Sequence, residues 1–303
     1  MGKMKTFDTH DGLKIRFEIF RCGAKASQGR VVLLGGRSEF IEKYRETVDE
    51  LLGRKFDVAT FDWRGQGLSD RMLPNRYKGH VASYDDYLKD LTCFMDQYVP
   101  QHSGRPVIIL AHSMGAHIVL RYLHDHPGRV EKAVLTSPLI DIAGPVILRL
   151  TMKIMIKIAV RIGLKTNYAT NAGNVDSSKK QFVGNHLTRD RHRFQEMIRM
   201  MTEYPDVALG GVTFGWLDAT LKSIGHMMSK GYLEGITTPL LMISAGADTI
   251  VSMTAQKQAC RRLPNCHLVT IPDALHELLI ETDAVRERFW GFFDDFLWGT
   301  GKS

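Results

Sequence analysis

Residues 107–115 read Val-Ile-Ile-Leu-Ala-His-Ser-Met-Gly, and this stretch decides the fold. Its first four residues, 107–110, are apolar and are typical of a strand buried on both faces. A helical pattern follows directly, so Ser113 lies on a sharp turn between strand and helix. Ala111 and Gly115 stand two positions before and after it, where larger side chains would collide as strand and helix cross. The pattern is G-x-S-x-G with alanine at its first glycine. It allows two interpretations, a nucleophilic serine or a serine that caps an ordinary helix.

Short apolar runs alternate with helical segments along most of the chain. The alternation predicts an α/β fold with a mostly parallel sheet flanked by helices on both faces. Near the N-terminus, Lys5–His10 and Leu13–Phe20 flank Asp11-Gly12, which favours a tight hairpin. The last helix, Asp283–Leu297, is rich in aromatic residues and is expected to pack across the sheet. Predicted buried strands are 31–34, 58–61, 107–110, 133–135 and 240–243, and predicted helices include 84–98, 114–126 and 254–262.

One segment breaks this alternation. Residues 142–236 contain helical patterns but no convincing buried strand. We therefore predict that they form an inserted helical cap, or lid, over the carboxyl edge of the sheet. Residues 1–141 and 237–303 then form the core domain.

Three residues that follow predicted strands form the candidate catalytic set. A serine nucleophile requires a histidine that accepts its proton and a carboxylate that orients the histidine. Ser113 is followed along the chain by Asp248, after the strand 240–244, and by His276, after the extended run 267–271. Open α/β sheets place their active sites at this edge. We predict these three residues as catalytic, with Asp141 as the alternative acid.

Backbone N–H groups are expected to bind the negative charge that develops on the carbonyl oxygen of a substrate. Met114, directly after Ser113, can supply one donor. The loop after strand 31–34 reads Gly35-Gly36-Arg37, and its glycines let the backbone approach a ligand, so the N–H of Arg37 is the second candidate. The alternative is a flexible glycine turn with a solvated arginine. Gly36 and His112, which flank this machinery in the sequence, are predicted to contact the substrate.

Together these residues resemble the α/β-hydrolase family, and within it the monoacylglycerol lipase and bacterial lysophospholipase group. Residues 62–69, Asp-Trp-Arg-Gly-Gln-Gly-Leu-Ser, look like its D-x-R-G-x-G-x-S segment, and His276-Glu277-Leu278 resembles its terminal H-E-x stretch. Residues 36–44 resemble the segment with the oxyanion donor, although Gly35 stands where many relatives have histidine. The resemblance covers nearly the whole chain. It implies an esterase or lipase with a helical cap between the sixth and seventh strands of the main sheet.

The composition is that of a folded, enzyme-sized protein, with 303 residues of which 44% are hydrophobic and 24% charged. The formal net charge is +7, and residues 142–236 hold thirteen Lys and Arg against seven Asp and Glu. This segment could attract anionic lipid, an anionic substrate or nucleic acid. We expect no nucleic-acid partner, because the basic residues are not interleaved with aromatic stacking platforms.

Four cysteines, Cys22, Cys93, Cys260 and Cys266, lack C-x-x-C spacing and a histidine cluster at metal-ligand intervals. We interpret them as reduced structural thiols, and a disulfide between Cys260 and Cys266 stays open. Residues 1–11 are polar and contain no secretory signal. The expected location is the cytoplasm, with peripheral contact at the inner membrane as an option. No metal or organic cofactor is expected, and the oligomeric state is unknown.

A basic, apolar helix is predicted inside the cap. Gly144-Pro145 can open it and Gly163 can close it. Basic residues recur every four positions, at 149, 153, 157 and 161, and nearly all the others are apolar. Such a helix could lie on an anionic membrane surface, and its four charges exclude a membrane span. The alternative is a lid helix that packs its apolar side on the sheet and points its charges into water.

The sequence therefore predicts a serine hydrolase that cleaves carboxylic esters through an acyl-enzyme. A lysophospholipid or monoacylglycerol is the favoured substrate. Hydrolysis of another small ester, a thioester, an amide or a carbon–carbon bond remains an alternative. A second class of hypothesis is a ligand-binding protein on the same fold without catalysis, which the three filled triad positions oppose.

Overall fold

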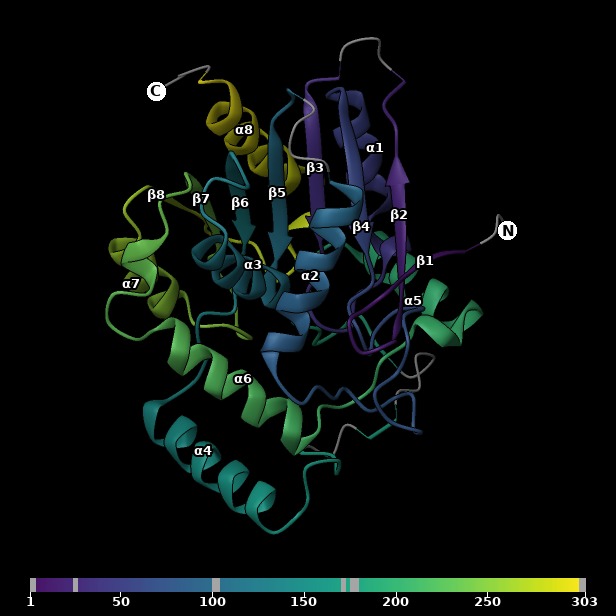
Figure 1. Ribbon diagram of the computed structural model, residues 1–303, viewed down its shortest axis with the longest axis vertical. Helices are drawn as coiled ribbons and strands as arrows, with labels where there is room; N and C mark the ends of the chain where they lie inside the picture. The colour runs from purple at the N-terminus through teal and green to yellow at the C-terminus, as the bar shows by residue number, and fades with distance from the viewer. Residues whose placement is uncertain (1–3, 24–26, 100–103, 170–172, 175–179, 300–303) are drawn as a thin grey trace.

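The computed structural model describes residues 4–23, 27–99, 104–169, 173–174 and 180–299. Eight strands of these residues form one sheet in the order β1-β2-β4-β3-β5-β6-β7-β8 (Figure 1). β2 pairs antiparallel with β1 and β4, and all pairs from β4 onward are parallel. The strands are β1 (Lys5–Asp8), β2 (Lys14–Phe20), β3 (Gly29–Leu34), β4 (Phe56–Phe61), β5 (Val107–His112), β6 (Lys132–Thr136), β7 (Leu240–Ala245) and β8 (Cys266–Ile271).

Helices cover both faces of the sheet because the central strands are apolar on both. In β3, Val31 and Leu33 pack in one core cluster with α1 and α8, while Val32 and Leu34 belong to the cluster with α2, α3 and α7. The predicted α/β fold is thus confirmed. The helices are α1 (Arg45–Gly53), α2 (Tyr84–Tyr98), α3 (Ser113–Asp125), α4 (Val146–Arg161), α5 (Arg191–Glu203), α6 (Phe214–Met227), α7 (Met253–Arg262) and α8 (Asp283–Trp298).

The N-terminal hairpin differs from its prediction in the turn. β1 ends at Asp8 rather than His10, so the connection is longer than the two residues Asp11-Gly12. The reason is local, because the hydroxyl of Thr9 donates to the carboxylate of Asp11 and accepts from the N–H of Leu13. Side-chain bonds of this kind compete with the strand ladder.

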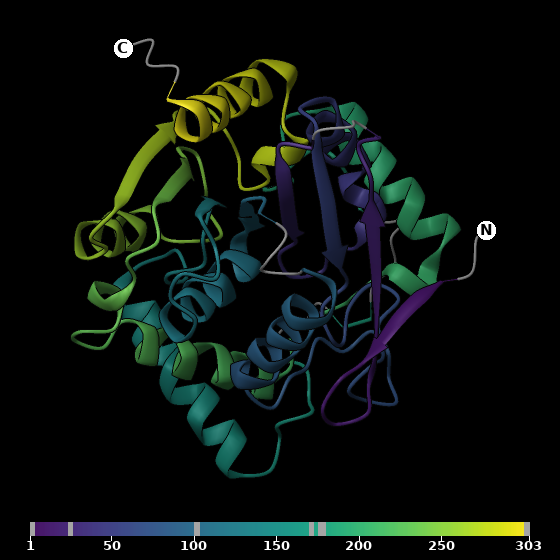
Figure 2. The ribbon, with the colours of Figure 1, turned by 45° about the horizontal axis from the view of Figure 1, so that its top comes forward.

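Between β6 and β7 the described residues form α4, α5 and α6, and no strand of the sheet. Figure 1 shows α4 and α6 beyond the end of the sheet to which the arrow of β5 points, and Figure 2 shows α4 on the outside of α6. α6 is the main contact of α4. The expectation that α4 packs its apolar side on the sheet is therefore wrong, because α6 lies between them. The boundaries of the cap at residues 142 and 236 stay a prediction.

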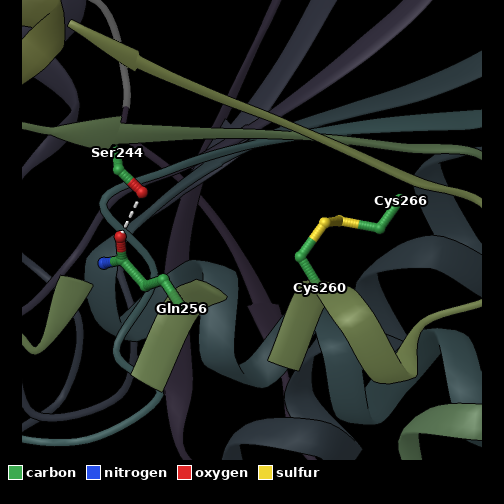
Figure 3. The surroundings of a disulfide bond; sticks show 4 residues. All are labelled: Ser244, Gln256, Cys260 and Cys266. Carbon is green, nitrogen blue, oxygen red and sulfur yellow. Dashed lines mark hydrogen bonds between the residues drawn. A yellow bond between two sulfur atoms is a disulfide. The ribbon is translucent and has the colours of Figure 1, made fainter. Parts of the chain in front are cut away.

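Two of the four cysteines form a disulfide, so the interpretation of all four as reduced thiols is wrong. Cys260 at the end of α7 is bonded to Cys266 at the start of β8, as Figure 3 shows. The turn between these elements brings the two Cα atoms to 5.4 Å, within the range that a disulfide requires. Nearby, the hydroxyl of Ser244 in β7 donates to the amide oxygen of Gln256 in α7 (Figure 3). Cys22 and Cys93 are free.

Candidate active site

Ser113 lies where β5 turns into α3, in a conformation that side chains rarely adopt. Its φ is +50°, in the left-handed region. Non-glycine residues are found there mainly where the surroundings enforce it, and such strain clusters at functional sites. The turn also explains Gly115, since a Cβ atom there would lie 2.4 Å from the carbonyl oxygen of Gly35. The β3 loop and the start of α3 are thus packed backbone to backbone.

The three predicted catalytic side chains meet at the carboxyl end of the sheet. Nε2 of His276 lies 3.0 Å from Oγ of Ser113, and Nδ1 of His276 lies 2.7 Å from Oδ2 of Asp248. All three side chains are largely shielded from solvent. The distances are hydrogen-bond distances, so one continuous chain of polar contacts runs from the carboxylate to the hydroxyl.

Each partner of Ser113 is fixed by the backbone around it. Oδ1 of Asp248 accepts from the N–H of Ile250 at 2.8 Å and of Val251 at 3.1 Å. The carbonyl of His276 accepts from the hydroxyl of Ser137 at 2.9 Å. Burial by itself raises the pKa of Asp248, but the hydrogen bond from His276 and the backbone N–H groups outweigh it and lower the pKa. The carboxylate therefore stays ionised beside the imidazole.

The two alternatives that the sequence left open find no support in this geometry. Ser113 begins α3, but the helix has no side-chain cap; the hydroxyl of Ser113 instead faces His276. Asp141, the alternative acid, forms an ion pair with Arg149 and accepts from the N–H of Ile142. Among the described residues, Asp248 is the carboxylate on the imidazole of His276.

The predicted oxyanion donors lie on two adjoining backbone segments. Arg37 and Met114 both line the cavity beside Ser113, and within the described part of the chain neither backbone N–H has a protein acceptor. The N–H of Gly36, in contrast, donates to the carboxylate of Glu39. The N–H groups of Arg37 and Met114 are therefore free to donate, and their role as oxyanion donors stays a prediction.

Comparison with known proteins places this chain in a family. The family model described as Serine aminopeptidase, S33, matches residues 25–283. The chain belongs to the α/β-hydrolase family. Lysophospholipase L2 of Escherichia coli (strain K12) is 31% identical over 283 residues, which cover 91% of this chain and 82% of that protein. The monoacylglycerol lipase of Mycolicibacterium smegmatis is 24% identical, over 84% of each chain.

Solved structures share the fold of this α/β-hydrolase. A soluble variant of monoglyceride lipase from Saccharomyces cerevisiae, in complex with a substrate analog, superposes with a TM-score of 0.78 at 20% identity, covering 98% of this chain and 94% of the other. The monoacylglycerol lipase of Paleococcus ferrophilus gives a TM-score of 0.70 at 19% identity, covering 93% and 98%. At these identities the likeness concerns the fold.

The two predicted substrate-contact residues of this α/β-hydrolase differ in position. His112 lines the cavity, with its ring centroid 4.8 Å from that of His276, and its Nδ1 is bonded to the hydroxyl of Thr136. Burial lowers the pKa of His112 to about 3, so its ring is neutral near pH 7. Gly36 is packed beneath Ser113, where a Cβ atom would lie 3.0 Å from the serine Cβ. It packs against Ser113 and is not among the described residues that line the cavity.

Sequence reasoning missed Gln66, which connects the loop after β3 with the start of α3, the two segments that carry the predicted oxyanion donors. Its amide oxygen accepts from the N–H of Ser38, and its amide nitrogen lies 3.8 Å from the sulfur of Met114. Gln66 is buried. The available signal is its place in the segment 62–69 that resembles the family, although the motif alone does not show which groups Gln66 contacts.

A buried charge cluster lies behind the oxyanion loop and was also missed. Nζ of Lys43 pairs with Glu39 and, at 2.7 Å, with Glu277, while the hydroxyl of Tyr44 donates to Glu39. His112 and the two glutamates offer ligand-type atoms within 4.8 Å of one another. Nζ of Lys43 contacts both carboxylates and so already occupies the place between them that a cation would take, and the cluster does not fit a metal site.

The cavity that opens beside Ser113 has a volume of about 520 Å³. Its walls come from residues 37–43, the start of α3, described residues between 180 and 220, and the loops that carry Asp248 and His276. Most of its lining side chains are apolar: Met114, Leu139, Ile142, Leu187, Met197, Met201, Leu209, Val212, Trp216, Ile250 and Val251. Such a surface can hold an acyl chain, because burial of each methylene group contributes about 0.8 kcal/mol.

Proposed function

We propose that this α/β-hydrolase cleaves the acyl ester of a lysophospholipid or monoacylglycerol through an acyl-enzyme on Ser113. Oγ of Ser113 attacks the carbonyl carbon while Nε2 of His276 accepts its proton, and Asp248 stabilises the imidazolium. The N–H groups of Arg37 and Met114 bind the oxyanion. The proton then passes to the leaving oxygen as the C–O bond breaks, and a water molecule repeats the sequence to release the fatty acid.

One observation carries this proposal: the hydrogen-bonded chain from Asp248 through His276 to Ser113, at the mouth of an apolar cavity. The names of the relatives support the substrate class, since a lysophospholipase and a monoacylglycerol lipase are both among them. In this proposal residues 142–236 act as the cap that shields the acyl chain from water.

Amide hydrolysis is the second candidate, because the family model is described as a serine aminopeptidase. An aminopeptidase must bind the α-ammonium group of its substrate, for which a free carboxylate is suited. In this cavity Glu39 and Glu277 are both paired with Lys43, and the guanidinium of Arg37 has no carboxylate partner among the described residues. The charge of the cavity therefore favours an anionic or neutral substrate over an ammonium group.

The nucleophile is tested with a fluorophosphonate probe on the wild type and on Ser113→Ala. We expect labelling to disappear in the variant. Ser252→Ala is the matched control, because Ser252 caps α7 through a hydrogen bond to the N–H of Ala255. We expect this control to be labelled like the wild type, and labelling that persists in Ser113→Ala would overturn the assignment. Comparison of p-nitrophenyl esters with aminoacyl p-nitroanilides then separates ester from amide hydrolysis.

α4 supports a second part of the proposal, contact with an anionic membrane. Ile156 and Ala159 are its buried residues, whereas seven large apolar side chains of the helix are more than half exposed. A contiguous exposed apolar surface of this kind marks an interaction site. Within the described residues no helix is long and apolar enough to span a membrane. The exposed apolar side chains are Val146, Ile147, Leu148, Leu150, Ile154, Met155 and Ile158.

Charge on α4 indicates the sign of the membrane surface. Arg149 pairs with Asp141, but Lys153, Lys157 and Arg161 have no acidic partner among the described residues. Each such residue contributes about 1 kcal/mol to binding an anionic bilayer. We expect the protein to float with vesicles that contain phosphatidylglycerol and to bind less to pure phosphatidylcholine vesicles. Absence of binding to the anionic vesicles would contradict this part of the proposal.

A further inference from the structure

The guanidinium group of Arg37 forms part of the cavity wall without a counter-ion. Its Nη2 donates to the carbonyl of Gly210, and its Cζ lies 5.6 Å from the ring centroid of Trp216. Its Nε is buried and has no hydrogen-bond partner. Within the described part of the chain no carboxylate pairs with it. Arg16 and Arg64, two buried arginines, each contact two or more carboxylates, whereas Arg37 is half-buried and contacts none among the described residues.

A buried positive charge without a counter-ion is costly, so its retention requires a reason. Burial lowers the pKa of Arg37 to about 10, which leaves the group protonated near pH 7. Its remaining donors match the geometry of an oxyanion such as phosphate, which guanidinium binds through parallel hydrogen bonds. An anionic group of a substrate therefore suits this position in the cavity.

Two chain segments that are hydrogen-bonded to each other, residues 77–79 and 210–211, surround the guanidinium of Arg37. The N–H of Gly79 donates to the carbonyl of Gly211 at 2.9 Å, and the N–H of Gly210 donates to the carbonyl of Tyr77 at 2.8 Å. A Cβ atom on Gly79 would lie 2.9 Å from Nη2 of Arg37. The absence of a side chain at residue 79 therefore leaves the space that the guanidinium fills.

The charged side chains near Arg37 leave this part of the cavity positively charged. Lys43 is neutralised by Glu39 and Glu277. Lys180 also lines the cavity and has no acidic partner among the described residues. Desolvation, together with the positive charges of Arg37 and Lys43, lowers the pKa of Lys180. The cavity therefore combines an apolar wall for an acyl chain with a cationic pole on the cap side.

We propose that the side chain of Arg37 binds the phosphodiester of a lysophospholipid head group and so makes this enzyme prefer lysophospholipids to monoacylglycerols. This inference rests on the proposed function and narrows its substrate class. A monoacylglycerol carries no anion and would leave the guanidinium unpaired. Hydrogen bonds to charged groups are worth enough to make this difference about 10- to 100-fold in kcat/KM.

The test compares kcat/KM for a lysophosphatidylethanolamine and a monoacylglycerol with the same short acyl chain, both below their micelle-forming concentrations. The ratio of the two values is the readout, because it cancels any loss common to both substrates. We expect Arg37→Gln to lower the ratio about tenfold or more and Arg37→Lys to lower it less. Lys230→Gln removes one charge from an exposed site outside the cavity and should leave the ratio unchanged. An unchanged ratio in Arg37→Gln would overturn the proposal.

A binding measurement separates this inference from the proposed function. Ser113→Ala is titrated calorimetrically with an ether-linked lysophosphatidylethanolamine and with the matching glycerol ether, so that no chemistry is required. Arg37→Gln in the same background should weaken binding of the phospholipid about tenfold and change binding of the glycerol ether little. Equal loss for both ligands would overturn the role of Arg37. Wild type without activity on any ester would instead overturn the proposed function.

Discussion

The rim, which comprises Ser113, Asp248 and His276, differs from the helix α4 in the kind of side chain that it buries. At the rim, polar side chains are buried and bonded to one another, as in the chain from Asp248 to Ser113. On α4, apolar side chains face outward although water surrounds them. The first arrangement fixes reacting groups, and the second leaves a surface for a partner. This contrast predicts that rim substitutions change catalysis steeply, while α4 tolerates change with little loss of stability.

The largest expected effect is that of Asp248→Asn. The amide cannot hold His276 in the correct tautomer or stabilise its imidazolium, so kcat should fall about 10⁴-fold on a soluble ester. The measurement is steady-state hydrolysis of a short p-nitrophenyl ester. Asp141→Asn is the control, because its carboxylate contacts Arg149 rather than His276. A comparable loss of kcat in this control would break the assignment of the acid.

The next effect tests the backbone packing at the rim. Gly115→Ala places a methyl group 2.4 Å from the carbonyl oxygen of Gly35 and should displace the oxyanion loop. We expect kcat to fall about 100-fold and stability by about 1–3 kcal/mol. Gly225→Ala in α6 meets no atom within 4 Å and should raise stability by about 0.5–1 kcal/mol. Equal kcat in both variants would show that the packing of Gly115 against Gly35 does not position the N–H groups of Arg37 and Met114.

A third prediction concerns acid stability and a buried histidine of α3. Burial lowers the pKa of His117 to about 4, while its nitrogens contact the carbonyl of Leu139 and the hydroxyl of Ser223. The unfolded chain takes up this proton near pH 6.5, before the folded protein does. Stability is therefore lost as the pH falls from 6.5 toward 4, by about 2 kcal/mol at pH 5.

Urea unfolding at pH 7 and pH 5 measures this loss. His117→Gln cannot take up the proton, so its stability should depend less on pH by about that amount. The variant itself costs some stability at pH 7, which the comparison across pH values cancels. Parallel pH profiles for wild type and variant would contradict the prediction.

The smallest expected effect lies on α4. Ile147, Ile154 and Ile158 are exposed, so replacing each with serine should change the free energy of unfolding by no more than about 0.5 kcal/mol. The same substitutions should reduce flotation with anionic vesicles, because they remove apolar area from the membrane contact. Ile156→Ser, on the buried side of the helix, should cost about 2–5 kcal/mol. A large loss of stability in the variants at exposed positions would show that these side chains of α4 stabilise the fold, and it would contradict the contrast with the side chains around Ser113.

Much of the fold followed from local patterns. The apolar runs and helical periodicities predicted strands and helices that the structure confirms, because a strand buried on both faces and an amphipathic helix each leave a signature within a few residues. The connection between β1 and β2 is longer than predicted, because Thr9 and Asp11 bond to each other and the dipeptide Asp11-Gly12 does not reveal this bond. The prediction of four reduced cysteines was wrong, because the distance between Cys260 and Cys266 is set by the turn after α7.

The candidate site divides in the same way. Ser113, Asp248 and His276 could be nominated from their places after strands, since parallel strands end at one edge. Gln66 and the side chain of Arg37 could not, because their roles depend on segments far away in the sequence. The guanidinium of Arg37 meets Gly79 and Gly210 only in the folded chain, because these residues are far apart in the sequence.

By itself the sequence determined the strand and helix order, the edge at which the reacting groups gather and the mixed apolar and basic character of α4. These are properties of neighbouring residues and of the chirality and periodicity of the backbone. Only the tertiary structure decided which face of α4 is covered, where the positive pole of the cavity lies and which carboxylates are already neutralised. These features depend on contacts between segments that are distant in the sequence. The burial of a side chain and its ion-pair partner are determined only when those segments pack together.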